Sequence, residues 1–267
     1  MNQSELILSR AELIFLLKQM GAAQVAGVDL PELAAGAVNL EGVLAEGKQT
    51  LLSRSLISTA GTAVPELLAV MAVLAHCDMA LILVRGMKGI GQQLFVFDFL
   101  DEQILEHIRP DEKTHRLVWI QNKAALLDRV TQLVPLVAVE AQGRFLFEIK
   151  VAAFNQARKL AKMGEAKQAL DILIQQDWAP DLAENFLHTL DQLEFTLSLA
   201  CLKTRNGEVV DASSVAVLAS ADASWGIWPG DQSDEEPGYS VFPTGITDLY
   251  EAITGWLDSR NRARAGH

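Results

Sequence analysis

The sequence contains little cysteine and few aromatic residues. Only two of its 267 residues are cysteines, and Phe, Trp and Tyr together make up 6%. A disulfide framework needs several paired cysteines, so the class of small disulfide-stabilised scaffolds is excluded. Cys77 and Cys201 both stand in apolar runs, where a free thiol behaves as a small buried hydrophobe. We therefore expect neither a disulfide bond nor a reactive thiol.

Positive charge is also scarce. The chain has 22 Lys and Arg residues against 34 Asp and Glu, which gives a formal net charge of -12 and a pI near 4.9. Binding to nucleic acid depends on clustered basic side chains, and the one basic cluster, Arg260, Arg262 and Arg264, suits the C-terminal end of a helix. The composition therefore predicts that nucleic acid is not a partner.

Long apolar runs and the pattern of an export signal are missing as well. No stretch approaches the ~18 uninterrupted apolar residues that a membrane-spanning helix requires. The first residues, MNQSELILSRAE, lack a basic segment followed by an apolar segment and a small-residue cleavage site. These two features predict a cytoplasmic protein that does not bind membranes.

Motifs for catalysis and metal binding are absent too. His107 and His115 have acidic neighbours, but they are eight positions apart across Pro110 and do not follow a zinc-binding spacing. The segment Gly86 to Gly91 lies between two expected strands and precedes no helix, so it fits a hairpin turn better than a phosphate loop. No Gly-x-Ser-x-Gly elbow occurs. The sequence thus predicts no enzymatic activity, no cofactor and no metal ion.

What the sequence does contain is an internal repeat. Glu46 to Leu52 reads EGKQTLL and Glu165 to Asp171 reads EAKQALD, an offset of 165 − 46 = 119 positions. With this offset, apolar runs of the two halves align without gaps as far as Pro110 and Pro229. The offset becomes 239 − 116 = 123 after the longer acidic loop Gly230 to Gly238. Such a pattern predicts an internal duplication of one structural unit.

The repeat determines the expected domain organisation. We expect a single domain, 1–267, with pseudo-repeats of about 1–142 and 143–267 whose shared cores are 46–134 and 165–257. Each half reads as helices, then an antiparallel meander of about four strands, then a helix, which is an α+β arrangement. Since four strands cannot bury both faces alone, we predict a central antiparallel sheet with quasi-two-fold symmetry.

The first helix has the clearest local signals. Ser9 and Glu12 have the spacing of a capping box, and Gly21 closes the helix that follows. Its counterpart runs from Glu148 to Met163, and the residues between 22 and 45 are read as a loop with a short helix. Further helices are expected at 46–57, 64–75, 124–134, 165–176, 181–192 and 246–257, and strands at 79–84, 94–100, 104–108, 117–120, 197–202, 215–218, 223–228 and 239–242. Asn206-Gly207 predicts a tight hairpin turn.

Two tryptophans beside an acidic loop form the most distinctive local chemistry. Trp225 and Trp228 are three positions apart, so they cannot face the same side of a regular strand. One of them is expected in the core, and the other is a candidate for a partner-binding edge, although burial of both remains an alternative. The predicted binding residues are Trp225, Trp228, Pro229, Asp231, Asp234, Glu235, Glu236 and Tyr239.

The order of these segments resembles the EspG family of type VII secretion chaperones. The resemblance is carried by SRAELIFLLKQMGA, then LPEL, then LLSRSLI, then the strand series from Met79 to Ile120 with a helix ending in TQLVPL, and by the echoes of these segments in the second half. It implies a quasi-two-fold α+β fold and a cytosolic chaperone that holds helical secretion substrates soluble.

Three functions follow as hypotheses. The leading one is a non-enzymatic chaperone or adaptor, a monomer or homodimer, that binds another protein through a sheet surface and the loops Gly86 to Gly91 and Gly230 to Gly238. The first alternative is a transcriptional regulator that uses paired short helices as winged helices. The second alternative is an enzyme or ligand-binding protein with a site between the two halves.

Overall fold

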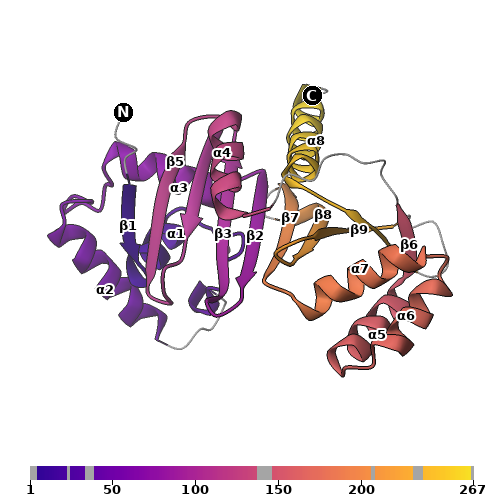
Figure 1. The fold of residues 1–267 in the computed structure, drawn as a ribbon. Helices are drawn as coiled ribbons and strands as arrows, with labels where there is room; N and C mark the ends of the chain where they lie inside the picture. The colour runs from indigo at the N-terminus through magenta and orange to yellow at the C-terminus, as the bar shows by residue number, and fades with distance from the viewer. Residues whose placement is uncertain are drawn as a thin grey trace. The chain divides into compact units, whose positions relative to one another are not determined.

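The chain folds into an α+β protein whose helices and strands follow the predicted order. The computed structural model describes residues 5–22, 25–33, 39–136, 146–205, 208–230 and 237–265. Over these residues the first half contains β1 (Glu5–Ser9), α1 (Arg10–Gln19), a 3-10 turn (Pro31–Leu33), α2 (Leu40–Ser53), α3 (Pro65–His76), β2 (Met79–Met87), β3 (Gly91–Leu100), β4 (Gln103–Ile108), β5 (Thr114–Ile120) and α4 (Lys123–Leu133). Figure 1 shows these elements in indigo to magenta.

The second half repeats this order. It contains β6 (Phe147–Lys150), α5 (Val151–Lys162), α6 (Ala166–Ile174), α7 (Pro180–Asp191), β7 (Phe195–Arg205), β8 (Glu208–Ala219), β9 (Ser224–Pro229), β10 (Gly238–Pro243) and α8 (Ile246–Ala265). The described strands form one sheet in the order β1-β5-β4-β3-β2-β7-β8-β9-β10-β6. The strands β1 and β6 were not predicted, because each is a short segment immediately before a helix that has a much stronger signal. The turn Asn206-Gly207 lies outside the described residues.

Two compact units make up the fold, and they do not coincide with the two halves of the sequence. Unit 1 comprises Met1–Leu83, Leu94–Leu126 and Ala200–Ser213, and unit 2 comprises Val84–Gln93, Leu127–Leu199 and Ser214–His267. The tip of the β2–β3 hairpin therefore belongs to unit 2, and the tip of the β7–β8 hairpin belongs to unit 1. Each unit is thus completed by residues from the other half.

The capping box at the start of α1 organises the helical side of unit 1. Ser9 accepts a hydrogen bond from the Glu12 amide at 3.2 Å, and the Glu12 carboxylate accepts one from the Ser9 amide at 2.6 Å. Helix α1 ends before Gly21, whose φ of 72° closes the helix as predicted. Gly47 lies against the carbonyl of Ala11, where a Cβ atom would come within 2.2 Å, so its lack of a side chain lets α2 approach α1.

The core of unit 1 lies between the helices α1, α2 and α3 and one face of the strands. Residues on that face of β1, β4 and β5, including Leu8, Leu105 and Leu117, pack with the buried faces of the helices. Asp98 and Leu105 are directly paired across β3 and β4, so both point to this face. The cross-strand register therefore determines which polar side chains are buried beneath the helices.

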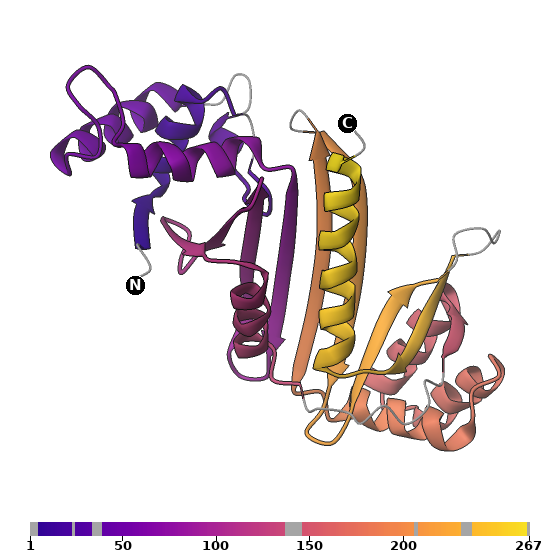
Figure 2. The same cartoon turned by 90° about the horizontal axis from the view of Figure 1, so that it is seen from above.

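Unit 2 has an equivalent core that is richer in aromatic residues. Helices α5, α6 and α7 pack on one face of β6, β9 and β10, and Figure 2 shows the three helices grouped beside the last strands. The core side chains include Phe154 of α5, Phe186 of α7 and Trp178 of the connection between α6 and α7. The helix α8 buries a stripe at Leu249, Ile253 and Leu257, which are four positions apart. None of the described helices is long and apolar enough to cross a bilayer.

Similar backbone hydrogen bonds in the two halves lie at different offsets, which the single ungapped offset of 119 across the strands does not accommodate. Asp78 N–H donates to Phe99 and Glu194 N–H donates to Ala219 in equivalent bonds, at offsets of 194 − 78 = 116 and 219 − 99 = 120. The hairpin β7–β8 is therefore four residues longer than β2–β3, an insertion that an ungapped alignment cannot place. We propose that the two halves arose by duplication, which these equivalent bonds support.

Candidate protein-binding surface

The two tryptophans of β9 point to opposite faces of the sheet, as their spacing predicted. Trp225 pairs with Pro243 of β10 and Trp228 pairs with Ser240, so alternation places the two indoles on different sides. Trp225 is 1% exposed, whereas Trp228 is half-buried. The prediction that one indole belongs to the core is confirmed for Trp225.

Trp225 anchors the aromatic core of unit 2, and its assignment to the binding surface is wrong. Its ring stacks on Trp178 at 6.0 Å and meets Phe186 edge-on at 5.3 Å. Its indole N–H donates to the Asn185 side chain at 3.2 Å, so the one polar atom is satisfied. A side chain enclosed in this way cannot contact a partner, because the helix-side core already occupies the space around it.

Tyr239 also faces the helices. It lies opposite Pro229 across β9 and β10 and packs edge-on against Phe154, with ring centroids 5.2 Å apart. The side chain is half-buried and adjoins the same core as Trp225. Tyr239 and Trp228 therefore lie on opposite faces of the sheet, so the predicted residues do not form one continuous surface.

Trp228 lies on the other face of the sheet, away from the core of α5, α6 and α7. Its ring packs against Phe242 with centroids 4.7 Å apart. A Cβ atom at Gly226 would come within 2.1 Å of the Trp228 ring, so only glycine lets the indole lie flat over the strand. Phe242 was not among the predicted surface residues. It lies two positions after Ser240, which pairs with Trp228, so strand alternation places Phe242 on the same face as Trp228 and could have identified it.

Of the remaining predicted residues, the structure describes Pro229, which ends β9. Pro229 is exposed, and Asp231, Asp234, Glu235 and Glu236 lie outside the described residues. The other predicted loop, Gly86 to Gly91, is the hairpin turn that the sequence indicated. Ile90 at its tip is 64% exposed, between Gly89 and Gly91, which have φ values of 80° and 92°.

A buried acid lies beneath the helices of unit 1. Asp98 in β3 is fully buried, and neither carboxyl oxygen accepts a well-formed hydrogen bond from the described residues. The thiol of Cys77, a weak donor, is the polar group beside it. Burial raises the pKa of Asp98 to about 8, so the side chain is a neutral carboxylic acid at pH 7.

A histidine pair is buried on the same face of the sheet. His107 Nε2 and His115 Nδ1 are 2.8 Å apart, so one ring donates and the other accepts. The pKa of His107 is lowered to about 3 and that of His115 to about 4, chiefly by burial and in part by the positive charge of Arg109. The two remaining ring nitrogens are buried without a partner among the described residues. The pair is therefore held in its neutral form.

The histidine pair predicts a loss of stability in acid. Both folded-state pKa values lie below the unfolded value of 6.5, so the unfolded state binds more protons and stability falls as the pH drops below 6.5. We expect a loss of roughly 2–3 kcal/mol between pH 6.5 and pH 5, measured by urea unfolding. The double variant His107→Leu/His115→Leu is expected to lack most of this loss. An equally steep acid loss in that variant would show that other groups cause it.

The described residues offer no centre for catalysis by a metal or a thiol. They contain no group of three or more His, Cys, Asp and Glu side chains placed to hold a metal ion. Burial raises the pKa of the Cys77 thiol to about 12 and that of Cys201 to about 11, so both remain protonated at neutral pH. The half-buried aromatic pair Trp228 and Phe242 is thus the candidate for recognition.

Comparison with known proteins identifies the fold. No protein-family model and no curated protein matches the sequence. The structure is similar to the type VII secretion system chaperone EspG5 of Mycobacterium tuberculosis, which was solved in complex with a PE25–PPE41 dimer. The similarity has a TM-score of 0.69, covers 96% of each chain and is accompanied by 11% sequence identity. The chain therefore has the architecture of an EspG chaperone, as the order of its segments indicated.

Proposed function

We propose that this protein is a non-enzymatic chaperone or adaptor that binds a helical secretion substrate. The observation that carries the proposal is the match to a secretion chaperone over 96% of both chains. The half-buried aromatic pair Trp228 and Phe242 supports the proposal as well, because such a pair suits recognition of another protein.

The proposed contact is centred on Trp228 and Phe242 in unit 2. An aromatic pair that is half-buried in the free protein offers a large apolar area and loses little side-chain entropy on binding. Pro229 pairs with Tyr239 and therefore lies on the opposite face from Trp228, and the acidic segment 231–236 follows it in sequence. Aromatic side chains with charged neighbours are the usual composition of a protein interface, with apolar anchors inside and a polar rim outside.

The test uses the PE25–PPE41 dimer as a probe, because the structurally similar chaperone was solved with that dimer. We expect this protein to bind the dimer in isothermal titration calorimetry. Trp228→Ala is expected to weaken binding by at least about tenfold, the usual effect of truncating a central aromatic anchor. Leu68→Ala is the control, since Leu68 is 45% exposed on α3 in unit 1 and its truncation removes apolar surface elsewhere.

Two results would count against the proposal. Absence of a complex at about 100 μM of each protein, where even weak specific binding is measurable, would remove this class of client. Equal binding by the Trp228→Ala variant and the wild-type protein would remove the surface but keep the client. A thermal melt of each variant checks that the fold survives, and Trp228 is exposed enough for its loss to be tolerated.

A further inference from the structure

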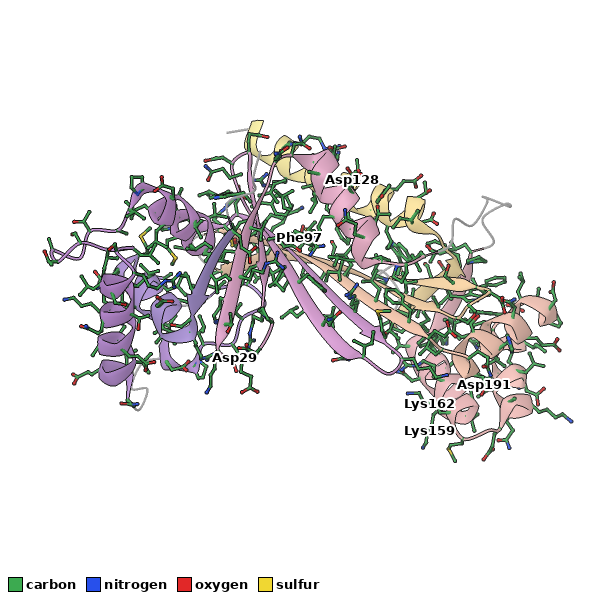
Figure 3. The ribbon with its side chains drawn as sticks, turned by 60° about the vertical axis from the view of Figure 1, so that its left-hand side comes forward. Asp29, Phe97, Asp128, Lys159, Lys162 and Asp191 are labelled. Atoms are coloured by element: carbon green, nitrogen blue, oxygen red, sulfur yellow. The ribbon has the colours of Figure 1, made fainter. Side chains whose placement is uncertain are left out.

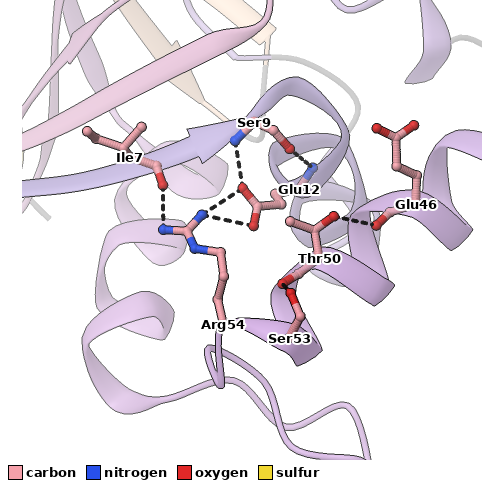
Figure 4. Close-up of polar contacts among 7 residues, drawn as sticks. All are labelled: Ile7, Ser9, Glu12, Glu46, Thr50, Ser53 and Arg54. Carbon is pink, nitrogen blue, oxygen red and sulfur yellow. Dashed lines mark hydrogen bonds and ion pairs between the residues drawn. The ribbon is translucent and has the colours of Figure 1, made fainter.

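The edge of strand β1 in unit 1 is closed by side chains. Arg10 N–H donates to the carbonyl of Lys113, immediately before β5, and this bond continues the β1–β5 pairing, so the odd-numbered residues of β1 turn their backbone groups away from the sheet. Arg54 donates to the Ile7 carbonyl at 2.9 Å and to both Glu12 oxygens at 2.9 Å, and Glu12 accepts the Ser9 amide. Figure 4 shows these contacts. Side chains thus bond to the outward backbone groups of β1 that another strand would otherwise use.

Part of the edge of strand β8 is not covered in this way. β9 pairs only with Ala216–Ala219 of β8, and the bond from Ser220 N–H to Ala223 continues this pairing. The alternation shows that even-numbered residues of β8 turn their N–H and C=O groups toward the β9 side. The segment Glu208–Ser213 extends beyond the end of this pairing, and no described strand pairs with it on the β9 side.

The side chains of this segment are exposed as well. Val209 is 53% exposed and Val210 is 60% exposed, and their neighbours Glu208, Asp211 and Ala212 are also exposed. An ion pair between Lys203 and Asp211, at 2.8 Å, links the segment to β7. The Asp211 carboxylate also accepts the Ala212 amide. Val210 is the central residue of the segment, and no hydrogen bond joins its outward N–H or C=O group to another of the described residues. An open edge with exposed β-branched residues favours the addition of another strand.

We propose that the β8 edge, Glu208–Ser213, binds an extended basic segment of another protein by adding it to the sheet as a strand. The net charge of -12 attracts a basic segment and repels a second copy of this chain. Glu208 lies at the end of the edge where it can pair with a Lys or Arg of the partner. The site is separate from the Trp228 surface, so it stands whether or not a helical client binds there.

A designed peptide tests the edge directly. The probe is a fluorescein-labelled peptide of sequence KVTVTVK, with EVTVTVE as the matched acidic peptide, and the measurement is fluorescence anisotropy at low salt. Both peptides favour an extended conformation, so they differ chiefly in charge. We expect the basic peptide to bind at least about tenfold more tightly than the acidic one, because electrostatic complementarity favours it. Hydrogen exchange of the Val210 amide is expected to slow when the basic peptide is bound.

Two changes to the backbone show whether binding uses strand addition. Val210→Pro removes an N–H group that points away from β7, so it blocks the edge without breaking the hairpin, and we expect at least about tenfold weaker binding. Val210→Thr keeps the N–H group and the β-branch, and it is expected to bind like the wild-type protein. N-methylation of every internal amide of the basic peptide blocks both of its edges and is expected to abolish its binding to the wild-type protein.

The N-methylated peptide keeps the test independent of any folding defect in the proline variant. Equal binding of the N-methylated and unmodified basic peptides would overturn the proposal, because strand addition requires the amide donors. No detectable binding of the basic peptide at about 1 mM would overturn it as well. Neither result depends on the PE25–PPE41 dimer, so a failure here is distinguishable from a failure of the proposed chaperone function.

Discussion

Replacement of Asp98 by asparagine is expected to make the protein progressively more stable than the wild type as the pH rises from 4 to 8. The folded-state pKa of Asp98 is about 8, above the usual 3.8, so the folded state holds a proton that the unfolded state has released. Stability from this group is therefore complete below pH 3.8 and is lost as the pH rises to 8. At about 1.4 kcal/mol per pKa unit, the wild type loses on the order of 4–5 kcal/mol over this range.

The measurement is urea unfolding of the wild type and Asp98→Asn at pH 5, 6, 7 and 8. The difference between the two proteins is the readout, because asparagine has the shape of aspartate but does not ionise. Asp128→Asn is the control, since Asp128 is exposed on α4, and Figure 3 labels it. A difference that stays constant from pH 5 to pH 8 would show that Asp98 is not held as a neutral acid.

The buried acid and the buried histidine pair impose opposite pH slopes. Below pH 6.5 the two histidines destabilise the fold as the pH falls, and their combined slope exceeds that of the single aspartate. Above pH 6.5 only the slope of Asp98 remains, and stability falls as the pH rises. We therefore expect the greatest stability near pH 6.5 in the wild type, with the maximum shifted to higher pH in Asp98→Asn.

Truncation of Trp225 to alanine is expected to cost about 3–5 kcal/mol of stability, the range for a fully buried large aromatic residue. The side chain is 1% exposed and contacts Trp178 and Phe186, and its indole N–H is bonded to Asn185. Its removal leaves a cavity in the core of unit 2 and an amide oxygen without its donor. The free energy of unfolding in urea measures the loss.

Trp228→Ala is the matched comparison, because it removes the same side chain from the same strand. Trp228 is half-buried against Phe242, so its removal is expected to cost about 1–2 kcal/mol, less than the loss at Trp225. The two variants thus separate folding from recognition: Trp225→Ala reduces stability, and Trp228→Ala reduces binding of the probe. A larger stability loss at Trp228 than at Trp225 would contradict the assignment of Trp225 to the core.

Local signals predicted the elements of the fold well. The capping box of Ser9 and Glu12 and the closing Gly21 located the first helix, and the alternation of β9 placed its two tryptophans on opposite faces. Each of these features depends on residues only a few positions apart.

Features that depend on strand register were predicted less well. The strand β1 pairs with residues more than a hundred positions away, and so it left no local signal. The spacing of His107 and His115 indicated no site, yet the register of β4 and β5 brings the two rings together under the helices. The contact between Trp228 and Phe242 also depends on the fold. Because Gly226 has no side chain, the Trp228 ring can lie over the strand and pack against Phe242.

The amino-acid sequence therefore determined the order of helices and strands, the α+β class and the segments that resemble EspG chaperones. Those properties follow from hydrophobic period, capping and turn residues, which act over distances of a few residues. The packing of the folded chain decided which tryptophan of β9 is enclosed in the core, which acid is neutral and which strand edge is open. These outcomes depend on long-range pairing, where a shift of one residue would move every side chain of a strand to the other face.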